Sequence, residues 1–188
     1  MIKAKCKKCI VCKKQFMPRM TTTKVCSLPC AIIEGKAKTA KQLAKRKTIE
    51  KKQTREAWLS LQPKSYWLQE AQKWFNKFIR MRDDNQACIS CGRHHTGQYH
   101  AGHYRSVGSS PHLRFNEHNC HRQCSVCNNY LSGNQIKYRQ ALINKIGVSE
   151  VEALEADNTP KHYTTDDIQQ LINHYKQKVK ALQNESII

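Results

Sequence analysis

The sequence has few acidic residues and no long apolar run. Only 14 Asp and Glu stand against 33 Lys and Arg, a net charge of +19 at pH 7. Such a charge exceeds what solubility requires and indicates a polyanionic partner, with nucleic acid as the first candidate. No stretch approaches the roughly 18 to 20 apolar residues of a membrane span, so we expect no membrane association. Met1 to Cys12 lack the apolar segment of a secretory signal, so we expect a cytosolic chain with reduced thiols.

Apolar side chains are also scarce, since 39% of the 188 residues are hydrophobic. This is low for a single large core, so we expect something other than apolar burial to help stabilise the chain. Cysteine, in contrast, is abundant, with ten residues. In a reducing compartment, closely spaced cysteines are more often metal ligands than disulfide partners.

Eight of the cysteines fall into two sets of four. Cys-x2-Cys lets two thiolates from one tight turn occupy two corners of a tetrahedron, and a second pair completes it. We therefore predict two structural zinc sites, formed by Cys9, Cys12, Cys26 and Cys30, and by Cys88, Cys91, Cys124 and Cys127. Cys6 and Cys120 are left over, and either could replace a ligand in the nearer set.

The pattern along the chain predicts four regions. Between Gly35 and Glu56 there are nine Lys or Arg against two Glu, which indicates an exposed basic helix. Seven of the nine histidines fall between His94 and His121. The regions are a zinc-binding module (1–33) too short to fold without metal, a basic helical linker (34–62), a helix with a Cys- and His-rich core (63–134), and a helical C-terminal region (135–188).

Helical spacing predicts the elements around this core. A helix begins near Ser65, and its apolar positions are Leu68, Ala71, Trp74, Phe75, Phe78 and Ile79. After the core we expect a helix from Asn134 to about Ile146, stopped by Gly147, and a short helix over residues 149–156. Thr164 or Thr165, followed by two Asp, begins a final amphipathic helix.

Between the paired cysteines of the second set, the sequence predicts a hairpin. Tyr99 to Ser106 is strand-like, Val107 to Pro111 supplies a loop, Leu113 to Gln123 is a second strand, and Ser125 can begin a helix. A zinc ion on the four cysteines would tie the ends of this ββα unit together. The residues between the cysteines would then face one cleft.

This segment resembles the HNH, or ββα-metal, nuclease family. That family places a catalytic His on the first strand, an Asn on the second, and a His or Asn after the last Cys-x2-Cys. The matching residues are His103, Asn119 and Asn128. The resemblance implies that His103 is the general base, that Asn119 orients it across the hairpin, and that Asn128 contributes to a Mg²⁺ or Mn²⁺ site distinct from the structural zinc.

The chain departs from the HNH pattern at two positions. Many family members carry an Asp metal ligand directly before the catalytic His, where this chain has Gly102. His100, Asn129 and Asn134 are candidate substitutes. Asn128 is also a weaker ligand than His, so the catalytic metal is expected to bind weakly.

A closer resemblance covers nearly the whole chain. The phrases SYWLQEAQKWFNKFIR, CISCGRHHTGQYHAGHYRS and LRFNEHNCHRQCSVCNNYLSGN, and the N-terminal KKCIVCKKQFMPRMTTTKVCSLPC, are similar to the NinG, or Rap, recombination proteins of lambdoid phages. The resemblance implies structure-specific cleavage of branched DNA, including D-loops and Holliday junctions, during phage homologous recombination in the host cytosol. Phage recombination proteins are then candidate partners, and paired cuts would favour a homodimer.

Together these features predict a small, mainly helical α+β protein. Its centre would be a zinc-bound ββα-metal core, HNH-like and of the treble-clef type, flanked by helices and preceded by an N-terminal zinc knuckle. We predict DNA-phosphate contacts by three arginines beside the cleft and three residues of the basic helix. These residues are Arg105, Arg114, Arg122, Lys45, Arg46 and Lys47.

Two other functions stay open. One is a zinc-stabilised DNA-binding or regulatory protein, such as an antitermination factor, with an inactive HNH-like fold, which Gly102 and Asn128 favour. The other is an RNA-binding or ribosome-associated zinc protein, which the charge alone leaves open. Metal-dependent nicking would separate the nuclease from the first alternative.

Overall fold

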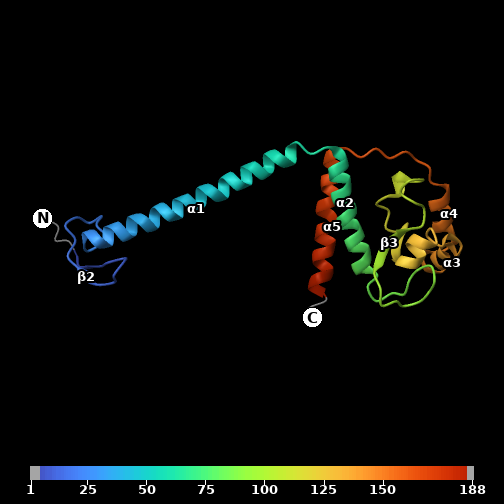
Figure 1. Cartoon of the computed structure of the whole chain (residues 1–188), viewed down its shortest axis with the longest axis horizontal. Coiled ribbons are helices and arrows are strands. Elements are labelled where there is room, and N and C mark those ends of the chain that lie inside the picture. The colour runs from blue at the N-terminus through green and yellow to red at the C-terminus, as the bar shows by residue number, and fades with distance from the viewer. Residues whose placement is uncertain (1–4, 186–188) are drawn as a thin grey trace. The chain divides into compact units, whose positions relative to one another are not determined.

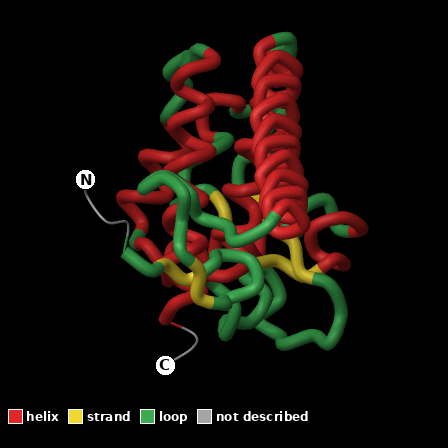
Figure 2. The backbone as a smooth tube through the Cα atoms, turned by 90° about the vertical axis from the view of Figure 1, so that its left-hand side faces the viewer, coloured by secondary structure: helices red, strands yellow, loops and turns green. Residues whose placement is uncertain are grey.

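The computed structural model describes residues 5–185. Residues 1–4, part of the segment in which we expect no secretory signal, lie outside the described residues. The chain divides into two compact units, Met1–Leu61 and Gln62–Ile188. Most of its regular structure is helix, with two short antiparallel sheets (Figure 2). This confirms the small, mainly helical α+β class.

The first unit, Met1–Leu61, consists of a cysteine-rich loop region and one long helix. Strand β1 (Lys7–Lys8) pairs with β2 (Gln15–Phe16), and α1 (Leu28–Ser60) follows with a Pro in its first turn. The basic segment is thus helical as predicted. Helix α1 runs unbroken across positions 33 and 34, where the sequence pattern suggested a boundary. Its one buried residue is Cys30, so α1 packs little apolar surface within the described chain.

The second unit, Gln62–Ile188, has its main core between two long helices. Helix α2 (Lys64–Arg82) and α5 (Thr165–Glu185) lie side by side (Figure 1). The apolar spacing predicted for α2 is confirmed, because the side chains that recur every three or four residues are buried against α5. The buried side chains of the two helices are Ala71, Phe75, Phe78, Ile79, Ile168, Ile172, Tyr175 and Val179.

A hairpin lies between this helix pair and a second helical layer. Strand β3 (Tyr99–His103) pairs with β4 (Cys120–Cys124), so that Tyr99 is opposite Cys124 and His103 is opposite Cys120. Helices α3 (Gln135–Ile146) and α4 (Val148–Ala156) cover the other side (Figure 1). They form a second apolar cluster with the hairpin, made of Tyr104, Leu113, Tyr138, Leu142, Val151 and Leu154.

The predicted second strand, Leu113 to Gln123, is wrong in length, and the first strand also ends before Ser106. A 3₁₀ helix η1 (Pro111–Leu113) and turns occupy the positions before Cys120. Side chains take over the backbone hydrogen bonds there. Asn116 Oδ1 accepts from the backbone N–H groups of His118 and Asn119 at 2.9 and 3.2 Å. Asn side chains favour such local bonds over a strand ladder.

The helix boundaries after the hairpin agree with the prediction. A short π-type helix η2 (Val126–Tyr130) follows β4. Gly147, with φ of +91°, separates α3 from α4. At the start of α5, Thr164 and Asp167 bond reciprocally: the backbone N–H of Asp167 donates to Thr164 Oγ1 at 3.1 Å, and the backbone N–H of Thr164 donates to Asp167 Oδ2 at 2.8 Å. Within residues 5–185, no helix is long and apolar enough to cross a bilayer.

Candidate functional site

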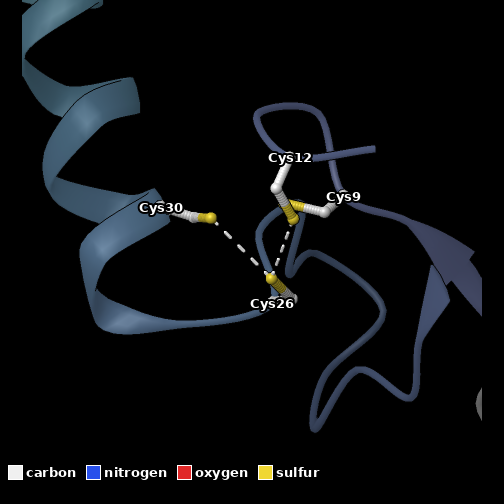
Figure 3. Close-up of side chains that lie close together, drawn as sticks. All are labelled: Cys9, Cys12, Cys26 and Cys30. Carbon is white, nitrogen blue, oxygen red and sulfur yellow. Dashed lines mark hydrogen bonds between the residues drawn. The ribbon is translucent and has the colours of Figure 1, made fainter. Parts of the chain in front are cut away.

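The first cysteine set gathers as predicted. The sulfur atoms of Cys9, Cys12, Cys26 and Cys30 all lie within 4.8 Å of one another. Figure 3 shows them converging from the loop after β1, the loop before α1 and the first turn of α1. Cys26 Sγ is 3.4 Å from Cys12 Sγ and 3.8 Å from Cys30 Sγ. Four thiolates at this spacing fit one tetrahedral zinc ion.

One thiol of this set is already disposed toward the thiolate form. Burial raises the pKa of Cys9, but backbone hydrogen bonds from Cys12, Val11 and Cys26 outweigh it and bring the pKa to about 6. A thiolate is the form that binds metal.

The second cysteine set also gathers as predicted, and it is more buried. The sulfur atoms of Cys88, Cys91, Cys124 and Cys127 lie within 4.8 Å of one another. The backbone N–H of Cys124 points to Cys88 Sγ at 3.3 Å, and Asn134 Nδ2 points to Cys127 Sγ at 3.5 Å. These donors stabilise thiolate charge and orient the ligands. The cluster can hold a second zinc ion.

The two leftover cysteines stay outside both clusters. Cys6 is exposed, with its Sγ 3.8 Å from Gln15 Oε1. Cys120 is fully buried in the core beside α2. Its Sγ lies 3.7 Å from His103 Nδ1, and burial raises the pKa of its thiol.

His103, at the end of β3, is held from both sides. Its Nε2 lies 2.9 Å from the carbonyl oxygen of Arg114, and its ring lies 5.9 Å from the Phe75 ring. A carbonyl oxygen only accepts, so this contact requires a proton on Nε2 and leaves Nδ1 basic. Burial lowers the pKa of His103, which outweighs the bond to Arg114. The imidazole is therefore neutral at pH 7.

Asn119 lies directly before β4 and is fully buried. Its Oδ1 accepts from the backbone N–H of Arg105 at 2.8 Å, and its Nδ2 donates to the carbonyl of the same residue at 3.0 Å. The amide thus fixes the backbone that leaves β3, rather than bonding the His103 ring.

The structure places Asn128 at the other end of the hairpin from His103. Asn128 follows Cys127 in η2, and its Nδ2 donates to Asn129 Oδ1 at 2.7 Å. Over the described residues, no hydrogen bond joins any two of His103, Asn119 and Asn128.

The space that a side chain at position 102 would occupy is filled by a neighbouring residue. A Cβ at Gly102 would lie 2.0 Å from Gln123 Oε1, so Gln123 occupies that space. His100 is directly opposite Gln123 in the strand register. Both His100 Nε2 and Gln123 Oε1 are buried without a hydrogen-bond partner in the described structure.

Two of the arginines predicted to contact phosphate make internal contacts. Arg105 donates to the carbonyls of Leu154, Glu155 and Asp157 at 2.7 to 3.0 Å. Arg122 donates to the Asp83 carbonyl at 3.1 Å, and its guanidinium lies 3.8 Å above the Tyr99 ring. These two side chains hold the hairpin to its neighbours.

The other predicted phosphate contacts are placed differently. Arg114 is half-buried, with its carbonyl turned to His103. Lys45, Arg46 and Lys47 are exposed on α1. Of the six residues, these three have the most open access to a polyanion.

Sequence reasoning missed a buried charged residue, Asp83. It is 1% exposed at the end of α2, bonds Arg82 at 2.8 Å, and accepts from the backbone N–H of Arg122 at 3.0 Å. Burial raises the pKa of Asp83, but Arg82 outweighs it and the pKa is lowered. The residue attaches α2 to β4, and only its rarity as an acidic residue in this part of the chain could have drawn attention to it.

Comparison with known proteins points to one family. Residues 1–185 match the family described as "Bacteriophage Lambda NinG protein". The chain is 44% identical over 126 residues to "Protein ninG" of Salmonella phage P22 and to that of Escherichia phage lambda, covering 67% of this chain and 62% of each relative. The identity to "Protein ninG" of Enterobacteria phage H19B is 42%. The aligned part thus spans less than two thirds of each relative, and no solved structure matches.

Proposed function

Because the chain belongs to the NinG family of phage proteins, we propose that it is a metal-dependent endonuclease that cleaves branched DNA. The substrates would be D-loops and Holliday junctions formed during phage recombination in the host cytosol. The hairpin, the helix that follows it and the second cysteine cluster together support an HNH-like ββα unit.

The observation that carries this proposal is the arrangement of His103. The Arg114 carbonyl holds its Nε2 proton, so that Nδ1, which lies 3.7 Å from Cys120 Sγ, is the nitrogen without a proton and the one that would accept a proton from water. The lowered pKa keeps the ring unprotonated at neutral pH. A fixed tautomer and a neutral ring are both requirements for a general base.

Asn119 supports the same site as a positioning residue. Its two bonds to Arg105 fix the chain just after His103 and Tyr104. Arg105 is in turn anchored through three carbonyls of the segment 154–157. The end of β3 therefore has little freedom to move, which keeps the base in one orientation.

The donors proposed for the catalytic ion lack a carboxylate. His100 offers a buried, unpartnered nitrogen on β3, and Asn128 and Asn129 offer amide oxygens in η2, at the other end of the hairpin from His103. Amide oxygen and imidazole are acceptable ligands for Mn²⁺, and weaker than carboxylate for Mg²⁺. A bound ion would supply positive charge to the phosphorane oxygens.

The direct test uses a labelled four-way junction and a matched linear duplex with Mg²⁺, Mn²⁺ or EDTA. We expect metal-dependent cutting of the junction, faster with Mn²⁺. His103→Ala should lower the cutting rate roughly 100- to 10,000-fold while junction binding stays within about twofold, because a general base contributes rate and not affinity. His118→Ala, at an exposed histidine in the connection between β3 and β4, is the matched control. Cutting by His103→Ala at the parental rate would contradict the proposed base.

A second candidate function is a DNA-binding protein with an inactive HNH-like fold. The observation that favours it is the Gln123 side chain in the space beside Gly102, where many HNH nucleases carry a metal-binding Asp. Tight junction binding without cutting in Mg²⁺ or Mn²⁺ would favour this function.

A further inference from the structure

Four large apolar side chains are exposed on one short segment of the second unit. The exposed fractions are 81% for Tyr130, 79% for Ile136, and 52% for both Val126 and Leu131. In the described part of Gln62–Ile188, the remaining large apolar side chain that is similarly exposed is Val148, at 50%. We call the segment Val126–Ile136 the apolar turn. Such local clustering of exposed apolar side chains indicates an interaction surface.

The backbone of the apolar turn is held firmly. The Gly133 carbonyl accepts from Gln123 Nε2 at 2.6 Å and from Ser90 Oγ at 3.2 Å, and both donor side chains are buried. The backbone N–H of Gly133 also donates to the Cys127 carbonyl at 2.9 Å. The turn is thus attached to the second cysteine cluster and to β4.

The same turn contains unfavourable backbone conformations. Gly133 has φ of +89°, which glycine adopts freely, but Ser132 and Asn134 have φ of +49° and +46°, and the left-handed region costs a residue such as Ser roughly 1 kcal/mol. The buried hydrogen bonds offset that cost. The fold therefore fixes a segment whose large apolar side chains are exposed to solvent. Burial of apolar surface within this chain does not explain why these side chains are apolar.

The charges around the apolar turn indicate what covers it. Along residues 85–149 the sequence has a single acidic residue, Glu117, against seven Lys or Arg, of which Arg122, Arg139 and Lys145 are paired with Asp84, Glu155 and Asp83. Two exposed cations lie next to the apolar turn: Lys137 directly follows Ile136, and Arg93 belongs to the loop whose Ser90 bonds the Gly133 carbonyl. Glu117 is itself paired with Lys178. A partner with negative charge and flat apolar faces fits such a surface, and nucleic-acid bases next to phosphates have both properties.

We propose that the apolar turn docks on unstacked bases at the branch point of DNA, with the Tyr130 ring stacking on an exposed base. The proposal rests on the proposed function and states how a branched substrate is told from a linear one. In a linear duplex each base is covered by its neighbours, whereas a branch exposes base faces. Asn128 and Asn129 lie within the same segment, so docking would bring the branch beside the proposed metal ligands.

The experiment measures equilibrium binding of the zinc-loaded full chain, in Ca²⁺, to a four-way junction and a linear duplex of equal length. A 2-aminopurine at the branch reports stacking. Tyr130→Ser and Ile136→Ser together should weaken junction binding at least fivefold and leave duplex binding within about twofold. Base–aromatic stacking is worth roughly 1 to 3 kcal/mol per base, and about 1.4 kcal/mol is tenfold. The parent protein should quench the 2-aminopurine, and the double variant should not.

Two control variants match the design. Tyr130→Phe keeps the ring and should keep the junction preference. Val148→Ser removes another exposed apolar side chain of the same unit, which lies outside the apolar turn, and should change nothing. Both controls and the double variant are compared at equal zinc content and equal thermal stability.

Several results would overturn the proposal. An unchanged ratio of duplex to junction affinity, or an equal loss for both DNAs, would show that the turn does not read the branch. A change of oligomeric state in the double variant, measured by sedimentation, would assign the turn to a contact between two copies of this chain. A parent protein that does not prefer the junction overturns it as well. Loss of junction preference in a protein that never cuts DNA would instead keep this proposal and reject the nuclease.

Discussion

Each of the two units contains a cysteine cluster, but the units differ in net charge and in how much apolar surface they bury. Residues 1–61 have 17 Lys or Arg against 3 acidic residues, whereas residues 62–188 have 16 against 11. Among the described residues of Met1–Leu61, only Cys9, Pro18 and Cys30 are buried. The second unit has two apolar clusters besides its cysteines. A metal ion held by the cysteines would therefore replace a hydrophobic core in the first unit and supplement one in the second.

Removal of zinc should produce the largest difference in stability between the two units. Structural zinc contributes about 10 to 16 kcal/mol in zinc-finger peptides. A chelator should therefore abolish amide-exchange protection over residues 6–27 and leave α2 and α5 protected through their own core. Hydrogen exchange with mass spectrometry checks this. Persistent protection of residues 6–27 without zinc would contradict it.

The number of zinc ions bound per chain tests which cysteines are ligands in each unit. The intact chain should carry two zinc ions. Cys26→Ser should reduce the number to one, because three thiolates hold zinc far less tightly than four. Cys6→Ser, at an exposed cysteine outside the clusters, should still carry two. Elemental analysis of the purified variants measures this, and loss of zinc from Cys6→Ser would place Cys6 among the ligands.

A core substitution should have the next largest effect, and only in the second unit. Phe75 is fully buried, with its ring centroid 5.1 Å from that of Tyr175 and 5.8 Å from that of Phe115. Phe75→Ala should lower the free energy of unfolding by about 3 to 5 kcal/mol. Leu43→Ala, at a position 51% exposed on α1, should change it by less than about 0.5 kcal/mol. Urea denaturation of both variants would show whether α1 lacks a packed partner in the free protein.

Acid should destabilise the second unit through a buried histidine. Burial, with Lys145 and Arg82 nearby, lowers the pKa of His121 to about 3. In the unfolded chain the pKa is about 6.5. Between these values the unfolded state binds more protons, so this contribution to stability is complete above pH 6.5 and falls as the pH drops toward 3. The slope is at most about 1.4 kcal/mol per pH unit.

The control for this pH dependence separates it from loss of zinc. His121→Phe should flatten the slope between pH 6.5 and 4 relative to the parent, whereas His162→Phe, at an exposed site, should not. Both variants retain all eight cysteines of the clusters, so acid release of zinc affects them equally. Equal slopes in all three proteins would remove His121 from the explanation.

The smallest expected effect concerns phosphate contacts of the basic helix. Replacing Lys45, Arg46 and Lys47 by Ala should reduce the slope of log K against log salt for duplex DNA by about 0.9 per lost contact. The same number of charges removed from α2 and α5, at Lys64, Lys176 and Lys180, should change it less. An unchanged slope for the α1 variant would mean that α1 does not lie on DNA.

Much of the fold could be predicted because its signals are local. Paired cysteines at short spacing predicted both cysteine clusters, and each could hold a zinc ion. Apolar spacing predicted α2, and a Thr-Asp start predicted α5. These features depend on residues within one or two turns of each other, where spacing alone restricts the structure.

The candidate site was harder to predict because its residues have partners far away in the sequence. The sequence positions of Arg105 and Arg122 suggested phosphate contacts. In the structure Arg105 instead bonds the segment 154–158, and Arg122 bonds Asp83 and Asp84. Asn119 read as a partner of the His103 ring, and its amide bonds the Arg105 backbone instead. A side chain's polarity does not reveal which backbone group will lie within reach of it.

The sequence by itself determined the positive charge, the eight clustered cysteines and the positions of the helices, because each follows from residue type and spacing. Only the tertiary structure decided which charges remain available. It buried Asp83, turned Arg105 and Arg122 inward, filled the space beside Gly102 with Gln123, and left Tyr130 and Ile136 exposed. Desolvation and hydrogen-bond geometry depend on which segments meet, and that is settled only when the chain is packed.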